Sequence, residues 1–215
     1  MTYQDLIAQL SQRKAIIVHC SPLGKALGDL LFPSDLKNAA QICAVESKEL
    51  CCSVIWPSHV RTWGAVGIIL RPRSTASIRS VSPIDAGSGY DRATGIRTGG
   101  GVPFTEEAVN DTFDNTADYN EWTVTDADTV GVFVNFNEPL AATTIVDATE
   151  IPGYRPEMSE VLCGPQAGER LITIEEIISE FAPLPVYTYR DGELVRLDAE
   201  VPSNASMLDL YPQTK

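Results

Sequence analysis

The chain has 215 residues, of which 44% are hydrophobic, so it can bury one sizeable core. Its 16 Lys and Arg residues stand against 29 Asp and Glu residues, and the formal charge of −13 opposes docking on a nucleic-acid backbone. The longest apolar runs, residues 65–70 and 130–134, are far shorter than the ~20 residues of a membrane-spanning helix. Neither nucleic-acid binding nor a membrane anchor is therefore expected.

The first residues and the cysteines favour a cytoplasmic protein. Residues 1–13 mix Gln, Asp and Ser into the apolar positions and lack a basic region followed by an apolar core, so no export signal is predicted. The five cysteines are too few and too irregularly spaced for a disulfide framework, and one is left over. This usage is typical of a reducing compartment.

The N-terminal segment predicts a short helix followed by a buried strand. Thr2 can cap an amphipathic helix over residues 3–12, whose apolar residues share one face. Residues 15–19 form an apolar run of strand length that ends on a polar residue. We expect this strand to bring His19 and Cys20 to the rim of a sheet, where chemistry is often found.

The next segment predicts a helix within residues 32–42 and three strands over residues 50–55, 65–70 and 76–81. Prolines and glycines separate the strands, which indicates a mostly antiparallel sheet.

A glycine-rich stretch follows at residues 83–103, with six glycines and with Tyr90, Arg92 and Arg97 among them. A long segment without an apolar period is predicted to be a loop, either a functional lid or a flexible excursion. It does not match a P-loop or a dinucleotide-binding fingerprint, although its amides, with Arg92 or Arg97, could contact a pyrophosphate.

The second half of the chain predicts further strands and helices. A short helix is expected at residues 106–110, with strands at residues 130–136, 143–146 and 159–163. A capping threonine precedes the helix predicted at residues 174–181, whose apolar residues share one face that should dock on the sheet.

The C-terminal segment predicts a hairpin and then a tail. Residues 186–190 and 193–197 flank Asp191-Gly192, a pair that favours a type I′ turn because both central residues need positive φ. Residues 202–215 are expected to be a loose tail unless three apolar residues dock: Leu208, Leu210 and Tyr211. The expected fold is one α+β domain over residues 1–201, with a mostly antiparallel split β-sheet core and a few flanking short helices.

The histidines and cysteines offer few catalytic arrangements. The chain has two histidines, His19 and His59, and each can equally be a rim or loop residue without a catalytic role. His19 and Cys20 are neighbours on a strand and point to opposite faces, so they cannot exchange a proton directly. A nucleophilic Cys52 with His59 stays open, although most cysteines are expected in the core. Without a C-x-x-C pair, no metal site is expected.

One carboxylate stands out because it opens an apolar strand. Glu160 precedes Val161-Leu162, and an acidic residue in such a position is costly to bury unless it is paired or used. The alternative is an edge-strand glutamate that faces water.

Taken together, His19-Cys20-Ser21 after the first strand, Cys52-Ser53 in the middle strand and Glu160-Val161-Leu162 in the late strand resemble the ADP-ribosyltransferase superfamily. That superfamily includes toxins and phage proteins that counter bacterial defence. The resemblance implies a split sheet that clamps NAD as a substrate, without a metal.

The same resemblance implies roles for individual residues. Glu160 would be the catalytic carboxylate that holds the nicotinamide ribose hydroxyl, and Ser53 would support the motif of the middle strand. His19 and Ser21 would contact NAD near the first strand, with Tyr90, Arg92 and Arg97 of the glycine-rich loop as further contacts. Tyr90, Tyr119 and Tyr154 are available to stack on nicotinamide.

Two hypotheses about function follow. The first is an NAD-dependent ADP-ribosyltransferase-like enzyme that modifies a protein or a small nucleotide, with a basic target protein favoured by the acidic charge. The second is a non-catalytic acidic binding or inhibitor module, of phage or antitoxin type, that covers a cationic site on a partner.

Overall fold

The computed structural model describes residues 1–20, 36–37, 39–41, 43, 49–62, 64–84, 90–91, 96–97, 101–116, 119–138, 140–143 and 169–212. The predicted strand at residues 159–163 lies outside these residues, as does most of the predicted glycine-rich loop. Of the helix predicted within residues 32–42, the described residues from 36 to 43 are helical, and Leu36 and Cys43 are buried.

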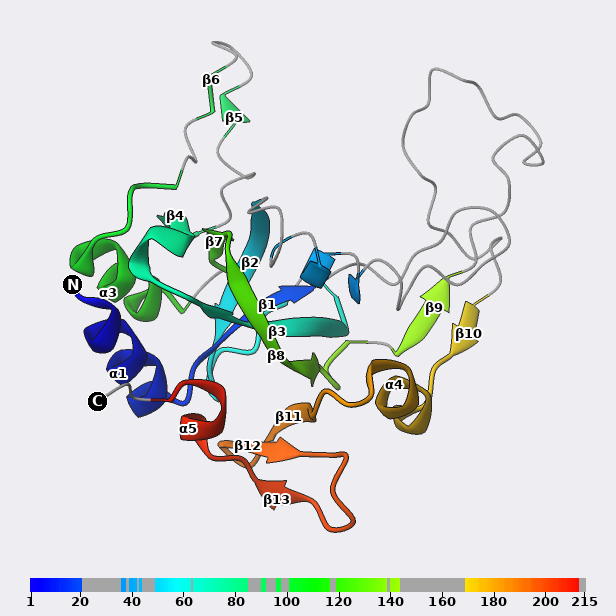
Figure 1. The fold of residues 1–215 in the computed structure, drawn as a ribbon. Helices are drawn as coiled ribbons and strands as arrows, with labels where there is room; N and C mark the ends of the chain where they lie inside the picture. The colour runs from blue at the N-terminus through cyan, green and yellow to red at the C-terminus, as the bar shows by residue number, and fades with distance from the viewer. Residues whose placement is uncertain are drawn as a thin grey trace, which may run out of the picture.

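A nine-stranded sheet organises the fold (Figure 1), in the order β13-β12-β11-β8-β3-β1-β2-β7-β4. Its strands are β1 (Ile16–Cys20), β2 (Leu50–Ile55), β3 (Val66–Pro72), β4 (Ile78–Ser82), β7 (Glu121–Val124), β8 (Ala127–Val134), β11 (Val186–Arg190), β12 (Glu193–Arg196) and β13 (Ser203–Asn204). Two small sheets pair β5 (Tyr90–Asp91) with β6 (Ile96–Arg97) and β9 (Ala141–Thr143) with β10 (Glu169–Leu171).

The described helices are α1 (Tyr3–Arg13), α3 (Glu106–Asp114), α4 (Ile174–Phe181) and α5 (Met207–Leu210), with a short 3₁₀ helix at Thr75–Ser77. The α+β class is confirmed. The large sheet is mixed, because β11 pairs with β8 in parallel while the other described pairs of that sheet are antiparallel.

The capped helices begin where the sequence predicts them. In α1 the Thr2 hydroxyl accepts from the Asp5 backbone N–H, and the Asp5 carboxylate accepts from the Thr2 backbone N–H. In α4 Thr173 and Glu176 form the same reciprocal box. Both helices then bury an apolar face, so local capping and amphipathicity agree.

Helix α3 is longer than its predicted span of residues 106–110. Its last turns are held by tertiary contacts, because Thr112 and Phe113 are buried. The Trp122 indole N–H donates to the Thr112 hydroxyl at 3.1 Å. A partner twelve residues from the predicted helix end cannot be recognised from the local pattern.

The hairpin at the end of β11 has the predicted turn. Asp191 and Gly192 have φ of 51° and 79°, so both occupy the left-handed region that a type I′ turn requires. Register pairs Arg190 with Glu193 directly across the turn. The predicted strand at residues 76–81 is different in part, because the 3₁₀ helix Thr75–Ser77 precedes β4.

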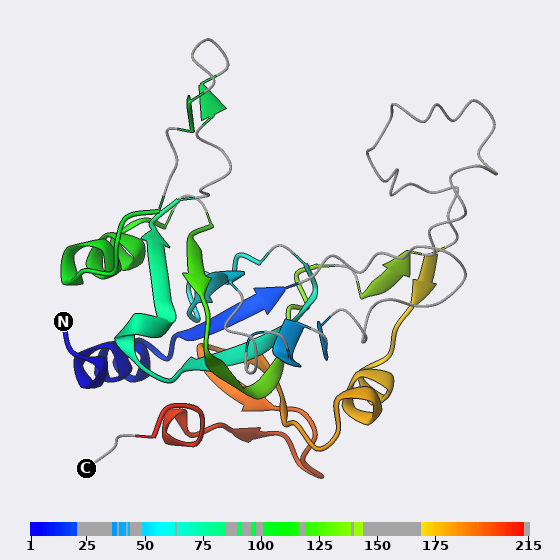
Figure 2. The ribbon, with the colours of Figure 1, turned by 45° about the horizontal axis from the view of Figure 1, so that its top comes forward.

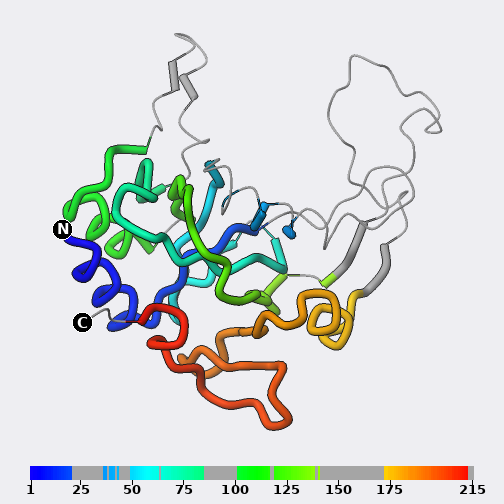
Figure 3. Tube along the Cα trace, viewed as in Figure 1, coloured from blue at the N-terminus to red at the C-terminus, as the bar shows by residue number. Residues whose placement is uncertain are grey.

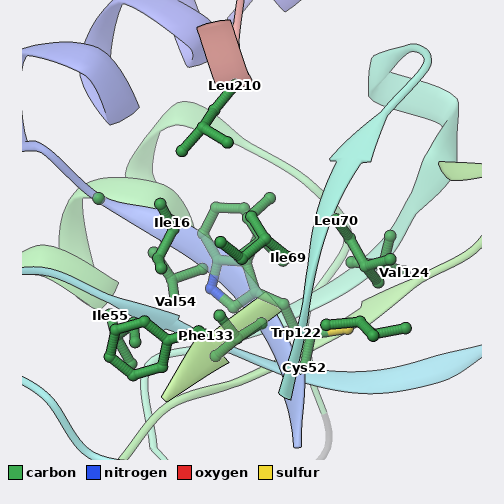
Figure 4. Packing of buried hydrophobic residues seen from close by; sticks show 14 of the residues in the cluster. Ile16, Cys52, Val54, Ile55, Ile69, Leu70, Trp122, Val124, Phe133 and Leu210 are labelled. Atoms are coloured by element: carbon green, nitrogen blue, oxygen red, sulfur yellow. The ribbon is translucent and has the colours of Figure 1, made fainter. Parts of the chain in front are cut away.

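Buried apolar side chains pack together at the centre of the sheet (Figure 4). Ile16, Ile69, Trp122 and Phe133 come from four different strands and are each 1% exposed or less. The predicted core is buried wherever it is described: Val18, Ile55, Val66, Ile68, Val132, Val134 and Ile177. Leu162 lies outside the described residues.

The C-terminal segment docks on this core instead of forming a free tail. Leu210 and Tyr211 are buried, while Leu208 stays exposed. The Tyr211 hydroxyl accepts from the Ile17 backbone N–H at 3.0 Å and donates to the Leu70 carbonyl at 3.2 Å. Helix α5 therefore lies close to α1 at one end of the sheet (Figures 1, 2 and 3).

No described helix has the length and apolar character needed to cross a membrane.

Candidate functional site

A small pocket of about 100 Å³ opens where strands β1, β2 and β7 lie side by side in the sheet. Its lining comes mainly from these strands: His19, Cys20, Cys51, Cys52, Ser53, Tyr119 and Glu121. The pairing of Val18 with Ser53 and of Cys52 with Trp122 sets the positions of these side chains. Adjacent strands thus bring an imidazole, a hydroxyl and a carboxylate to one opening.

The tautomer of His19 follows from its hydrogen bond. Its Nδ1 lies 2.7 Å from the Cys51 carbonyl oxygen, which can only accept, so Nδ1 carries the proton. Burial lowers the pKa of His19, and the hydrogen bond to Cys51 opposes this shift only in part. The imidazole is therefore neutral at pH 7, with the Nε2 lone pair available to accept a proton or a hydrogen bond.

Two thiols of this pocket, those of Cys20 and Cys52, are not activated nucleophiles. Burial raises the pKa of the Cys20 thiol to about 12 and raises the pKa of Cys52 well above its usual value. Cys52 lines the small pocket while His59 lines a different one. The open alternative of a Cys52 and His59 pair therefore finds no support in the geometry.

Gly67 leaves room for Cys20 at the end of β1. A Cβ at Gly67 would lie 2.5 Å from the Cys20 Sγ and 2.8 Å from the His19 carbonyl oxygen. The Cys20 thiol is also hydrogen-bonded to the Thr62 side chain and to the Gly64 backbone. Close approach of β1 and β3 therefore fixes the strand end that carries His19.

A second, open pocket of about 470 Å³ adjoins the first, because Tyr119 lines both. Its lining is largely polar: Ser58, His59, Val60, Arg61, Thr62, Thr116, Tyr119 and Glu138. His59 is only 3% exposed and stacks on Trp56 with ring centroids 4.3 Å apart. The hydrogen bond between the Cys20 and Thr62 side chains connects a residue of the small pocket with a residue of the larger one.

The structure brings together two of the predicted site residues, His19 and Ser53. Tyr90 and Arg97 lie on β5 and β6. The predicted residues Ser21, Arg92 and Glu160 lie outside the described residues.

Three charged residues of the two pockets were not singled out from the sequence: Glu121, Arg61 and Glu138. Glu121 opens a strand just as Glu160 was predicted to do, so the same signal could have identified it. Arg61 lies in an irregular segment without a recognisable pattern. Tyr119, one of the tyrosines considered for stacking, does lie in the site.

Within the described part of the chain, no group of three or more His, Cys, Asp or Glu side chains is arranged to hold a metal ion.

Comparison with protein-family models, with curated proteins and with solved structures finds no match to this chain.

Proposed function

We propose that the protein is an NAD-dependent ADP-ribosyltransferase-like enzyme whose reaction centre is the small pocket. The observation that carries this proposal is the convergence of His19, Ser53 and Glu121 from three adjacent strands, with Tyr119 beside them. These residue types suit a reaction that cleaves a glycosidic bond. Such cleavage develops positive oxocarbenium charge on the ribose, which a fixed carboxylate stabilises.

Each group has a definite task in this proposal. The neutral His19 accepts a hydrogen bond from a ribose hydroxyl through Nε2, and the Ser53 hydroxyl orients the same sugar. Tyr119 offers an aromatic face to the nicotinamide ring. Glu160, predicted from the sequence, and Glu121, which lines the pocket, are the two carboxylates that can stabilise the developing charge.

The size of the small pocket restricts what it can hold. Sites for complete small ligands commonly measure about 300–1,000 Å³. A pocket of about 100 Å³ accommodates only one part of NAD, so the rest of the dinucleotide has to lie outside it.

The proposal is tested by measuring nicotinamide release from NAD by the parent and by single Glu→Gln variants. Glu121→Gln or Glu160→Gln should lower turnover about 10²-fold or more, because the shape is kept and the charge is lost. Glu107→Gln, an exposed residue of α3, is the matched control and should turn over like the parent. Full turnover in both test variants, or none in the parent, would contradict the enzyme proposal.

A second candidate function rests on a different surface. Helix α3 exposes four carboxylates, and none forms an ion pair with a described residue: Glu106, Glu107, Asp111 and Asp114. Such a face fits a non-catalytic module that covers a basic site on a partner protein. Calorimetric titration with NAD separates the two candidates, since the binding module gives no heat.

A further inference from the structure

We propose that the larger pocket binds the phosphate group of a sugar phosphate or nucleotide through Arg61. This inference goes beyond the proposed function, because it requires no cleavage of NAD and concerns a different set of residues. It rests on the exposed Arg61 guanidinium in the pocket lining, on the hydrogen bonds that anchor the segment carrying Arg61, and on the volume of the pocket.

Arg61 places one cationic side chain in the lining of the larger pocket. Arg61 is exposed at the pocket and forms no ion pair with any described residue. What distinguishes Arg61 from Arg79 on β4, which also forms no ion pair with a described residue, is its position in the lining of a pocket. The hydroxyls of Ser58 and Thr116 lie in the same lining and can donate to the same anion. A planar guanidinium with flanking hydroxyls suits bidentate binding of phosphate.

The segment that carries Arg61 is anchored on both sides. Before it, Trp56 and His59 exchange two backbone hydrogen bonds of 3.2 and 2.8 Å, and their rings stack. After it, the Thr62 hydroxyl donates to the Gly64 carbonyl at 2.8 Å and accepts from the Asn135 amide at 2.9 Å. The pocket wall is therefore organised before a ligand binds, which lowers the entropy cost of binding.

Glu138, which lines the same pocket, indicates what the phosphate is attached to. It is exposed at the pocket, and it too forms no ion pair with a described residue. Its backbone N–H donates to the Asn135 carbonyl at 3.2 Å, which fixes the turn after β8. A carboxylate repels a bare phosphate but accepts hydrogen bonds from hydroxyl groups. Arg61 and Glu138 together therefore favour a phosphate ester of a sugar over inorganic phosphate.

The volume of about 470 Å³ lies within the range of small-molecule sites, so it can hold a sugar phosphate. Two sources of that group are possible: a separate sugar phosphate, or the pyrophosphate half of a dinucleotide that extends past Tyr119. Both share the same contact with Arg61, and the experiment distinguishes them.

The test titrates the full chain with ribose 5-phosphate, ADP-ribose and unphosphorylated ribose by calorimetry. We expect at least one phosphorylated probe to bind and ribose not to bind. Binding of both probes indicates that a sugar phosphate suffices, whereas binding of ADP-ribose alone identifies a dinucleotide as the source.

Arg61→Gln should weaken binding of the phosphorylated probe at least tenfold. Arg61→Lys keeps the charge but loses the bidentate geometry of the guanidinium, so its affinity should lie between those of the parent and Arg61→Gln. Arg79→Gln, an exposed arginine on β4 outside the pocket, should bind like the parent. Failure of both phosphorylated probes to bind, or equal affinity in a folded Arg61→Gln variant, would overturn the proposal. Nicotinamide release is measured separately, so binding without release rejects the proposed enzyme function and leaves this site standing.

Discussion

His19 couples the candidate site to pH at the scale of a single residue. Because burial lowers its pKa in the folded protein, the unfolded chain, in which histidine has its ordinary pKa of about 6.5, binds this proton more readily. The folded state should therefore lose stability as pH falls through the unfolded pKa. The loss should end once pH drops below the lowered folded pKa.

This pH dependence is measured as the free energy of unfolding between about pH 8 and pH 5, the range in which histidine titrates. The parent should lose more stability on acidification than His19→Asn, which cannot take up the proton. Parallel curves for the two proteins would show that His19 has an ordinary pKa when folded.

Gly67 provides a second prediction at this scale. Gly67→Ala places a Cβ against the Cys20 Sγ at 2.5 Å and the His19 carbonyl oxygen at 2.8 Å. Overpacking of this kind should lower the free energy of unfolding by about 1–3 kcal/mol, measured by urea denaturation. Adding Cys20→Ala removes the sulfur contact but leaves the carbonyl contact, so it should restore part of the loss. Strict additivity of the two single effects would contradict this account.

At the scale of an element, the β11–β12 turn allows a backbone effect to be isolated. Gly192 has φ of +79°, and a Cβ there would meet nothing within 4 Å. Gly192→Ala should therefore destabilise the protein by about 1 kcal/mol through backbone strain alone. Asp191→Asn, which keeps a residue that tolerates positive φ, is the control and should be close to neutral in the same denaturation experiment.

The elements that the sequence predicted well are those set by neighbouring residues. Thr2 and Thr173 identify two helix starts because the capping partners lie three residues away. Asp191-Gly192 identifies the hairpin because a tight turn needs no distant contact.

The remaining features depend on contacts between distant segments. The end of α3 depends on a hydrogen bond from Trp122. The parallel pairing of β11 with β8 joins residues that are more than fifty positions apart in the sequence, such as Val186 and Val132. The candidate site also combines residues that the sequence indicates with residues that only the folded structure brings together. His19 and Ser53 could be placed in one site, whereas the positions of Glu121 and Arg61 become clear only when the pockets are formed.

At the scale of the whole molecule, Tyr211 connects the C-terminal segment with two central strands. Tyr211→Phe keeps the ring but leaves the Ile17 backbone N–H buried without its acceptor, which should cost about 1–3 kcal/mol of unfolding free energy. Tyr187→Phe is the matched control: this residue is also buried, but its hydroxyl forms no hydrogen bond with a described residue, so the loss should be smaller. An equal loss in both variants would mean that the ring and not the hydroxyl anchors the segment.

The docking of Tyr211 also determines when two backbone groups of the central sheet can gain their hydrogen-bond partner during synthesis of the chain. A ribosome makes the chain from the N-terminus, so β1 and β3 emerge long before the residue that satisfies their backbone groups. Until then, the Ile17 N–H and the Leu70 carbonyl lack this partner at the centre of the sheet. A variant truncated before α5 should therefore unfold at a lower urea concentration than the parent, because both backbone groups would lack this hydrogen-bond partner.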